Sequence, residues 1–193
     1  MQPSVILAST SRYRAELLKR LNLDFQQIAP NCDESPLQDE AAPDLVARLA
    51  AGKAQSVAER FPEHLVIGSD QVASCNEAII GKPGNHADAV AQLQFLSGQT
   101  VSFLTGLCVM QQKSQQSLQC LVTTDVRFKR LDTAQIERYL AADQPYDCAA
   151  SFRSEGYGST IVENISSDDP TAIIGLPIIR VAVFLDTLGL QMP

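Results

Sequence analysis

The sequence predicts an α/β fold in which a mixed, twisted β-sheet is flanked by helices. Two observations indicate this class. Short apolar runs typical of buried strands alternate with helical segments through the first half of the 193-residue chain. Two long strand-like runs, residues 101–110 and 118–129, then follow each other across a polar turn, as in a hairpin. Helical connections favour parallel strands and a hairpin gives antiparallel ones, so both arrangements are expected in one sheet.

Three strands and two helices are expected in the first half. In chain order they are residues 4–8 (strand), 12–21 (helix), 24–28 (strand), 43–61 (helix) and 65–68 (strand). Helical spacing of Leu17, Leu18 and Leu21 predicts the first helix. Pro43 suits the first turn of the second helix. The third strand is expected to end at Asp70.

The second half is richer in strands. We expect a strand at 78–80, a helix at 86–96, strands at 101–110 and 118–129, a helix at 131–142, a strand at 160–162 and a helix at 177–188. Asn76 and Glu77 predict a turn before the first of these elements. Gly98 suits a left-handed helix C-terminus, and Asp132 suits a helix N-cap.

Composition narrows the class of partner. Residues 1–193 are expected to form a single domain, because no separable linker interrupts the chain and 193 residues suit one domain. Lys and Arg number 15 against 22 Asp and Glu, which gives a formal charge of −7. A nucleic-acid-binding surface normally shows a basic excess, so no nucleic-acid partner is expected. Small anionic ligands need only a local cluster of cations, so the composition does not exclude them.

A cytoplasmic location without membrane association is expected. The longest apolar stretch, residues 172–185, is interrupted by Pro177 and Arg180, and about 20 apolar residues are needed to span a bilayer. The first ten residues lack the cationic region of a signal peptide. Five scattered cysteines fit reduced cytosolic thiols better than a disulfide framework.

A first candidate site lies around residues 9–14. Ser11 is a good N-cap, but Arg12 and Arg14 then fall in the first helical turn, where the helix dipole disfavours cations. An anion bound at this helix start by free N–H groups, hydroxyls and guanidinium would explain them. The alternative is that exposed arginines tolerate a small penalty.

Lys53 is the second candidate. It falls on the apolar stripe of the long helix, together with Leu45, Leu49, Val57 and Phe61. A lysine on such a stripe either extends its ammonium to water or meets a buried anion. The sequence leaves both explanations open.

Carboxylates near predicted strand ends form the third candidate. Asp33 and Glu34 follow the second strand, and Asp70 ends the third. In open α/β sheets ligands gather at the carboxyl ends of strands, where these groups could meet Ser9 and the cations Arg14, Lys53 and Lys82. Carboxylates mixed with cations suit a polyphosphate bound with Mg²⁺ or Mn²⁺, whereas a solvated loop is the alternative for Asp33 and Glu34.

Residues 7–18, LASTSRYRAELL, resemble the opening L-A-S-x-S-P-R-R-x-E-L-L of the Maf family of nucleoside triphosphate pyrophosphatases. Further matches follow in order along nearly the whole chain: Asp33-Glu34, 48–54, 68–71, 81–83, 96–98 and 175–177. Arg12 stands at the family proline and Tyr13 at the first family arginine, while Arg14 keeps the second.

The resemblance extends to one branch of the family. An aromatic residue at Tyr13, together with Gln71 and Ser154-Glu155-Gly156, is similar to the YceF-like branch, which hydrolyses 7-methyl-GTP. Members acting on dTTP and UTP carry Asp-Thr where this chain has Asp70-Gln71. The cationic 7-methylguanine ring should stack on Tyr13, and Glu155 could accept from the guanine N1–H and amine. Gln71 would supply an amide contact or serve as a loop hydrogen-bonding residue.

The resemblance implies a Maf/ITPase-like fold, with two lobes around a central cleft, and hydrolysis of 7-methyl-GTP to 7-methyl-GMP and diphosphate. Asp70 would be the proton acceptor and, with Glu34, would hold a divalent metal cation. Three cations would bind the triphosphate and Ser9 would contact a phosphate; the cations are Arg14, Lys53 and Lys82.

A related substrate such as dTTP, UTP or another modified nucleotide is the first alternative. A non-catalytic nucleotide-binding regulator of cell division is the second, and a homodimer stays open.

Overall fold

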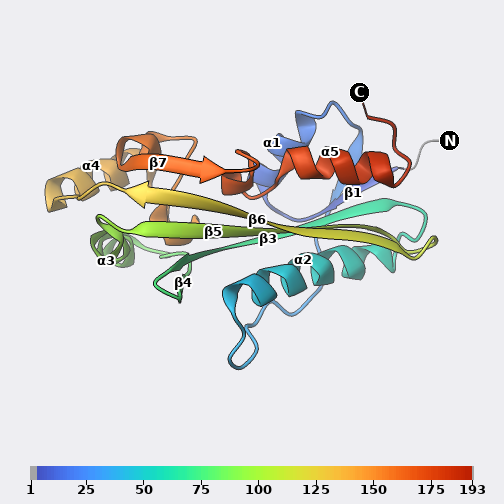
Figure 1. Cartoon of the computed structure of the whole chain (residues 1–193), viewed down its shortest axis with the longest axis horizontal. Coiled ribbons are helices and arrows are strands. Elements are labelled where there is room, and N and C mark those ends of the chain that lie inside the picture. The colour runs from blue at the N-terminus through green and yellow to red at the C-terminus, as the bar shows by residue number, and fades with distance from the viewer. Residues whose placement is uncertain (1–3, 193) are drawn as a thin grey trace. The chain divides into compact units, whose positions relative to one another are not determined.

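The computed structural model describes residues 4–192, within which one seven-stranded sheet is accompanied by five α-helices (Figure 1). The strands are β1 (Val5–Ala8), β2 (Phe25–Ile28), β3 (Leu65–Cys75), β4 (Ala78–Ile80), β5 (Thr100–Gln111), β6 (Gln116–Phe128) and β7 (Val162–Ser167). The helices are α1 (Arg12–Lys19), α2 (Ala42–Ala58), α3 (His86–Leu96), α4 (Thr133–Asp143) and α5 (Ile178–Thr187), with short 3-10 turns η1 (Ala149–Ser151), η2 (Tyr157–Thr160) and η3 (Ala172–Ile174). The predicted α/β class is confirmed.

The sheet is mixed, as predicted. Its strand order is β2-β1-β3-β5-β6-β7, and β4 pairs with β3 beside this path. β1 runs parallel to both β2 and β3, whereas β4 is antiparallel to β3 and β7 is antiparallel to β6. Among residues 4–192, no helix is both long and apolar enough to cross a membrane.

The chain forms two compact units. The first unit contains the residues up to Asp70, Thr105–Val122 and the residues from Asp169 onward, and the second unit contains Gln71–Leu104 and Thr123–Asp168. Strands β3, β5 and β6 each contribute residues to both units. Two lobes were predicted, and two units are present.

The first unit has helices on both faces of its strands (Figure 1). Val5 and Leu7 of β1 join a core with α1 and α5, whereas Ile6 and Ala8 join a second core with α2. Successive side chains of a strand point to opposite faces, so a strand covered on both faces is apolar throughout. This burial explains the continuous apolar sequence of β1.

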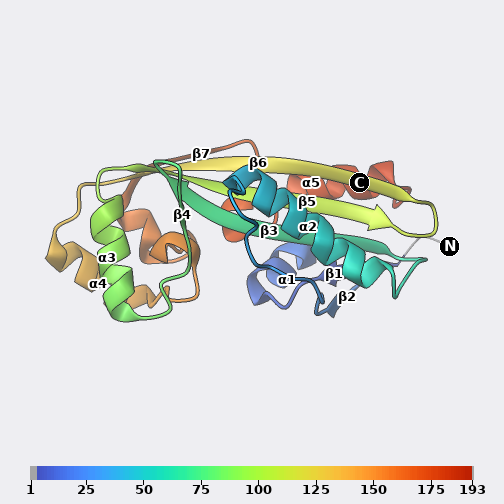
Figure 2. The same cartoon turned by 90° about the horizontal axis from the view of Figure 1, so that it is seen from below.

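Two glycines allow α2 to approach the sheet closely, and Figure 2 shows the helix lying across β3 and β5. A Cβ added at Gly68 of β3 would lie 2.6 Å from the Ala54 backbone nitrogen and still closer to the Ala50 carbonyl oxygen. A Cβ at Gly106 of β5 would lie 2.6 Å from the Val46 carbonyl oxygen. Helix backbone therefore occupies the space that larger residues would need.

The second unit packs α3 against α4 and the 3-10 turns η1 and η2. Asp132 caps α4, as predicted, and forms a reciprocal pair with Gln135 at the helix start. The ring of Phe152 lies between those of Phe103 and Phe128, with centroid distances of 5.8 and 5.4 Å. These aromatic contacts fix the segment that leads to residues 153–156.

Most element predictions are confirmed, and two are wrong. Residues 65–68 are only the start of β3, which continues to Cys75 because its later residues pair with β4 across the predicted turn at Asn76 and Glu77. Asp70 therefore lies inside a strand and not at its end. The strand expected at 160–162 is misplaced: η2 ends at Thr160, and β7 begins at Val162 and continues to Ser167 because it pairs with β6.

Candidate functional site

A charge cluster whose members Lys53 and Asp70 are buried lies between α2 and β3 of the first unit. The Lys53 ammonium donates to Asp70 Oδ1 at 2.6 Å and to Glu34 Oε2 at 2.8 Å. Lys53 is 6% exposed and Asp70 is 8% exposed. Lys53 therefore does not extend its ammonium to water. The second explanation left open by the sequence is the correct one, and the buried negative charge that Lys53 meets is supplied by the protein itself.

Strand periodicity brings Asp70 to α2. Gly68 faces this helix, and Asp70, two residues further along β3, points to the same face. The close approach at Gly68 brings the neighbouring turn of α2, which carries Lys53, within hydrogen-bond distance of Asp70. A buried carboxylate is tolerated inside this strand because a buried ammonium compensates its charge.

Glu34 reaches the cluster from the exposed loop after β2. The same loop is held to α2 by Arg48, which donates to both carboxylate oxygens of Glu40 at 2.6 and 2.7 Å and to the Ser35 carbonyl at 3.0 Å. Asp33 accepts from the Ser35 backbone N–H, which lowers the pKa of that carboxyl. Asp33 thus organises the loop, whereas its neighbour Glu34 contacts Lys53.

A cationic group lies beside this cluster, at the start of α1. Arg14 donates through Nε to the Gly175 carbonyl at 2.8 Å and through Nη1 to Ser9 Oγ at 3.4 Å. Burial lowers the pKa of the Arg14 guanidinium, and the nearby Asp70 and Glu34 carboxylates oppose this shift. Within residues 4–192 Arg14 forms no ion pair.

Ser9 and Ser11 complete the start of α1. Ser11 caps the helix by accepting from the Arg14 backbone N–H, and it donates its own N–H to Ser9 Oγ at 3.1 Å. Ser9 is buried. A partly buried guanidinium, a buried hydroxyl and a helix N-terminus gathered in one place can bind a phosphate group. The first unit thus brings together five predicted site residues: Ser9, Arg14, Glu34, Lys53 and Asp70.

The other predicted site residues, Tyr13 apart, belong to the second unit. Gln71 begins that unit directly after Asp70 in β3. Lys82 is exposed in the segment between β4 and α3. Glu155 is exposed in the segment before η2 and accepts from the Ser154 hydroxyl at 2.9 Å.

Tyr13 is partly buried on α1, and the side chain of the neighbouring Arg12 contacts its ring. The Arg12 guanidinium lies 4.8 Å from the Tyr13 ring centroid and donates to the Tyr13 hydroxyl at 2.8 Å. A cation already contacts this ring, which is the type of interaction predicted for a methylated guanine. Arg12 would have to share the ring or move when such a base stacks on it.

The donor atoms of the charge cluster fit a hard divalent cation. Carboxylate oxygens of Glu34 and Asp70 converge on one point, the Lys53 ammonium, and Mg²⁺ is commonly bound by one or two carboxylates plus substrate phosphates. Over residues 4–192 there is no group of three or more His, Cys, Asp or Glu side chains that could hold a metal alone. Substrate oxygens would therefore have to supply the remaining ligands.

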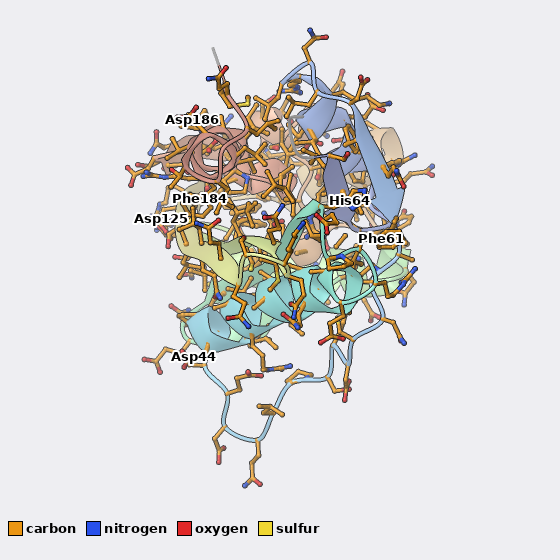
Figure 3. All side chains as sticks on the ribbon, turned by 90° about the vertical axis from the view of Figure 1, so that its right-hand side faces the viewer. Asp44, Phe61, His64, Asp125, Phe184 and Asp186 are labelled. Carbon is orange, nitrogen blue, oxygen red and sulfur yellow. The ribbon has the colours of Figure 1, made fainter. Side chains whose placement is uncertain are left out.

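Neither histidine contributes to this cluster. His64 packs edge-to-face on Phe61 between α2 and β3, with ring centroids 5.7 Å apart (Figure 3). His86 begins α3 and lies 3.1 Å from a Glu137 carboxylate oxygen.

Three further residues lie at or near the site and were not predicted as site residues. Ser69 donates to the carbonyls of Gly106 and Gly175 at 2.8 and 3.0 Å. Cys32 lies near Glu34, and burial raises the pKa of its thiol, so it stays protonated at neutral pH. Gly175 acts through its backbone carbonyl, which residue type does not reveal; only the Gly-Leu-Pro motif at 175–177 marked this segment.

Comparisons with known proteins show the family to which this chain is similar. The family model described as "Maf-like protein" matches residues 4–188. A 7-methyl-GTP pyrophosphatase of Pseudoalteromonas translucida is 47% identical over 192 residues, covering 100% of this chain and 95% of that protein. A protein of the same name from Nitrosococcus oceani is 48% identical, covering 97% and 94%. Among solved structures, the Staphylococcus aureus Ham1 protein matches with a TM-score of 0.49 and 12% identity, covering 66% of this chain and 72% of that one.

Proposed function

This chain belongs to the Maf family, and we propose that it is a pyrophosphatase that hydrolyses 7-methyl-GTP to 7-methyl-GMP and diphosphate. Relatives of nearly the same length and 44–48% identity carry the name 7-methyl-GTP pyrophosphatase. The observation that carries the proposal is the buried Asp70, held by Lys53 and close to the Arg14 guanidinium, which forms no ion pair within residues 4–192. A carboxylate is not needed merely to bind a polyanion, so its presence favours catalysis over binding alone.

Asp70 is suited to act as a general base. Lys53 contacts Oδ1, and among the described residues no donor contacts Oδ2, so this oxygen can accept a proton from water. The water would attack the α-phosphorus and release diphosphate. Lys53 fixes the carboxylate in one orientation, because both groups are buried and the two atoms are 2.6 Å apart.

Arg14 and Ser9 would hold the phosphate chain. The guanidinium can direct its terminal nitrogens at phosphate oxygens while Nε stays bound to the Gly175 carbonyl. Its charge would offset the negative charge that develops on the leaving diphosphate. Lys82 of the second unit is proposed as a further phosphate ligand, since its ammonium forms no ion pair within residues 4–192.

Mg²⁺ or Mn²⁺ is the proposed cofactor, held by Glu34 and Asp70 together with phosphate oxygens. When bound, it would withdraw charge from the phosphate oxygens and bring the triphosphate into a fixed position. Lys53 contacts both carboxylates and would remain their neighbour. Removal of divalent metal with a chelator should abolish turnover, and re-addition of Mg²⁺ or Mn²⁺ should restore it.

Base choice is assigned to Tyr13, Gln71 and Glu155. Tyr13 would stack on the cationic ring, Glu155 would accept from the guanine Watson–Crick edge, and Gln71 would add an amide contact. We also propose that the protein works in the cytoplasm, where it would remove modified nucleotides.

Asp70→Asn tests the proposal. The substitution keeps the shape of the side chain but removes the basic oxygen, so turnover of 7-methyl-GTP should fall by roughly 10²-fold or more. Binding of 7-methyl-GTP should survive, and the exposed Asp24→Asn variant serves as the matched carboxylate control. Near-normal turnover in Asp70→Asn would remove Asp70 from the mechanism. A native protein that binds but does not hydrolyse a panel of 7-methyl-GTP, GTP, dTTP and UTP would favour a regulator.

A further inference from the structure

Asp169 is a fully buried carboxylate that no step of the proposed mechanism uses. It is 0% exposed and lies in the first unit, before the turn η3. Its Oδ2 accepts from the backbone N–H groups of Ile179 at 2.8 Å and Arg180 at 3.3 Å, at the start of α5. Pro177, the residue at the N-cap position of this helix, makes no side-chain capping bond. Asp169 therefore caps α5 from outside the helix.

The second oxygen of Asp169 closes the loop that leads to α5. Oδ1 accepts from the Thr171 hydroxyl at 2.7 Å and from the Thr171 backbone N–H at 3.1 Å. Thr171 Oγ1 in turn lies 2.9 Å from the Leu176 carbonyl and accepts from the Ile178 N–H at 2.9 Å. Burying a carboxylate is costly unless it is well hydrogen-bonded, and these donors provide that compensation. Both ends of the segment 169–178 are thus tied to one carboxylate.

The closed loop directs one backbone carbonyl at Arg14. Gly175 has φ of +117°, and its carbonyl accepts from Arg14 Nε at 2.8 Å and from Ser69 Oγ at 3.0 Å. The loop is also anchored to β5, because Thr105 Oγ1 donates to the Ala172 carbonyl at 2.9 Å. The Gly175 carbonyl therefore fixes the plane of the guanidinium, whose remaining N–H groups are left for Ser9 and a phosphate.

We infer that Asp169 is a positioning residue for the phosphate site, acting through Thr171, the Gly175 carbonyl and Arg14. The inference rests on the proposed function in one respect, namely that Arg14 binds phosphate. Arginine has several rotatable bonds, so a guanidinium held in one plane before the ligand arrives loses less conformational freedom on binding. Loosening the loop should therefore weaken phosphate binding without removing any group that contacts phosphate.

The test is a double-mutant cycle between Asp169→Asn and Arg14→Ala. Two quantities are measured for each variant: kcat/KM for 7-methyl-GTP and the affinity for inorganic triphosphate. In the native background Asp169→Asn should lower both by about tenfold, as is typical when a group that orients a ligand-binding side chain is removed. In the Arg14→Ala background the same substitution should change the triphosphate affinity less than twofold. Equal losses in both backgrounds would overturn the inference, because a merely structural role acts irrespective of Arg14.

Two further variants keep the test decisive. Thr171→Val removes the hydroxyl that links Asp169 to the Ile178 N–H but retains the carboxylate, and it should show the same dependence on Arg14 if Asp169→Asn does not fold. Asp186→Asn is the matched control, since Asp186 is a carboxylate on the same helix that accepts from the Met192 N–H at 3.3 Å. It should change both quantities less than twofold.

The two readouts separate this inference from the proposed function. If native protein binds triphosphate with the expected coupling but hydrolyses no nucleotide, the proposed activity fails and the positioning role stands. If native protein hydrolyses 7-methyl-GTP but Asp169→Asn and Thr171→Val both leave triphosphate affinity unchanged, the positioning role fails and the activity stands. Absence of triphosphate binding by native protein would overturn the positioning role.

Discussion

Replacement of Gly68 by alanine should displace α2 and thereby disturb the charge cluster. The added Cβ would lie 2.6 Å from the Ala54 nitrogen and 2.9 Å from the Ala54 Cβ, and closer still to the Ala50 carbonyl. Non-bonded heavy atoms are comfortable at about 3.5–4.0 Å, so the shortfall is about 1 Å. Since the obstructing atoms belong largely to helix backbone, the helix itself must move or the clash must persist.

The magnitude follows from this displacement. Overpacking of this kind typically costs about 1–3 kcal/mol, and a rigid obstacle favours the upper end, about 3 kcal/mol. The Lys53 contacts to Asp70 and Glu34, now 2.6 and 2.8 Å, would lengthen by about 1 Å, beyond the range of a hydrogen bond. A misplacement of about 1 Å near a reacting group can cost about 10²-fold in turnover.

Urea unfolding and the rate of diphosphate release from 7-methyl-GTP measure the two effects. Gly52→Ala is the matched control, because it introduces the same atom into α2 itself, 3.8 Å from the Cys32 Cβ, and should stabilise the helix by about 0.5–1 kcal/mol. If Gly68→Ala were as stable and active as the native protein, close packing of α2 would not be what positions Lys53. A variant that is destabilised but fully active would separate packing from catalysis and refute the second half of the reasoning.

Three further predictions concern charged residues. Lys53→Met should lower the free energy of unfolding by about 3–5 kcal/mol, because it leaves the buried Asp70 uncompensated, and should lower turnover at least tenfold; a more stable variant in urea unfolding would contradict this. The Arg48 ion pair lowers the pKa of Glu40 to about 2, so its stabilising effect is complete above the usual value of 4.5 and is lost as pH falls towards 2. Arg48→Ala should therefore remove part of the fall in unfolding free energy between pH 6 and 3, and an unchanged pH dependence would count against the pair. Glu155→Ala should raise the activation free energy that corresponds to kcat/KM by about 1.5–3 kcal/mol for 7-methyl-GTP and by much less for dTTP. Equal losses of kcat/KM with both nucleotides would refute the assignment of Glu155 to the base.

Local sequence signals were sufficient to predict those elements whose structure depends on neighbouring residues. The helix at 86–96 was predicted with the bounds that the structure shows, because Gly98 (φ +72°) marks its end, and the structure adds an Asn85 cap at its start. The turn at Asn76 and Glu77 was predicted for the same reason, and both residues have positive φ. Such signals do not require knowledge of the rest of the fold.

Structure that depends on distant partners was predicted only in part. An aspartate is unfavourable in a strand, so β3 was expected to end at Asp70, but pairing with β4 and the charge of Lys53 allow it to continue. Periodicity placed Lys53 on a buried face but could not identify its partners. The same limit explains why methionine at position 53 looks favourable from the helix pattern alone and unfavourable once Asp70 is seen beside it.

The order of segments in the first unit has a consequence for how the protein folds. Its core joins Val5, Leu7 and Leu17 from the beginning of the chain to Val181 and Leu185 from the end. Contacts between residues so distant in sequence require closure of a long loop, which slows folding. During synthesis, at about 5–20 residues per second, the second unit has both of its segments before α5 emerges. The second unit, which begins later in the chain, can therefore complete its core first. One apolar face of β1 in the first unit stays uncovered until α5 has been synthesised.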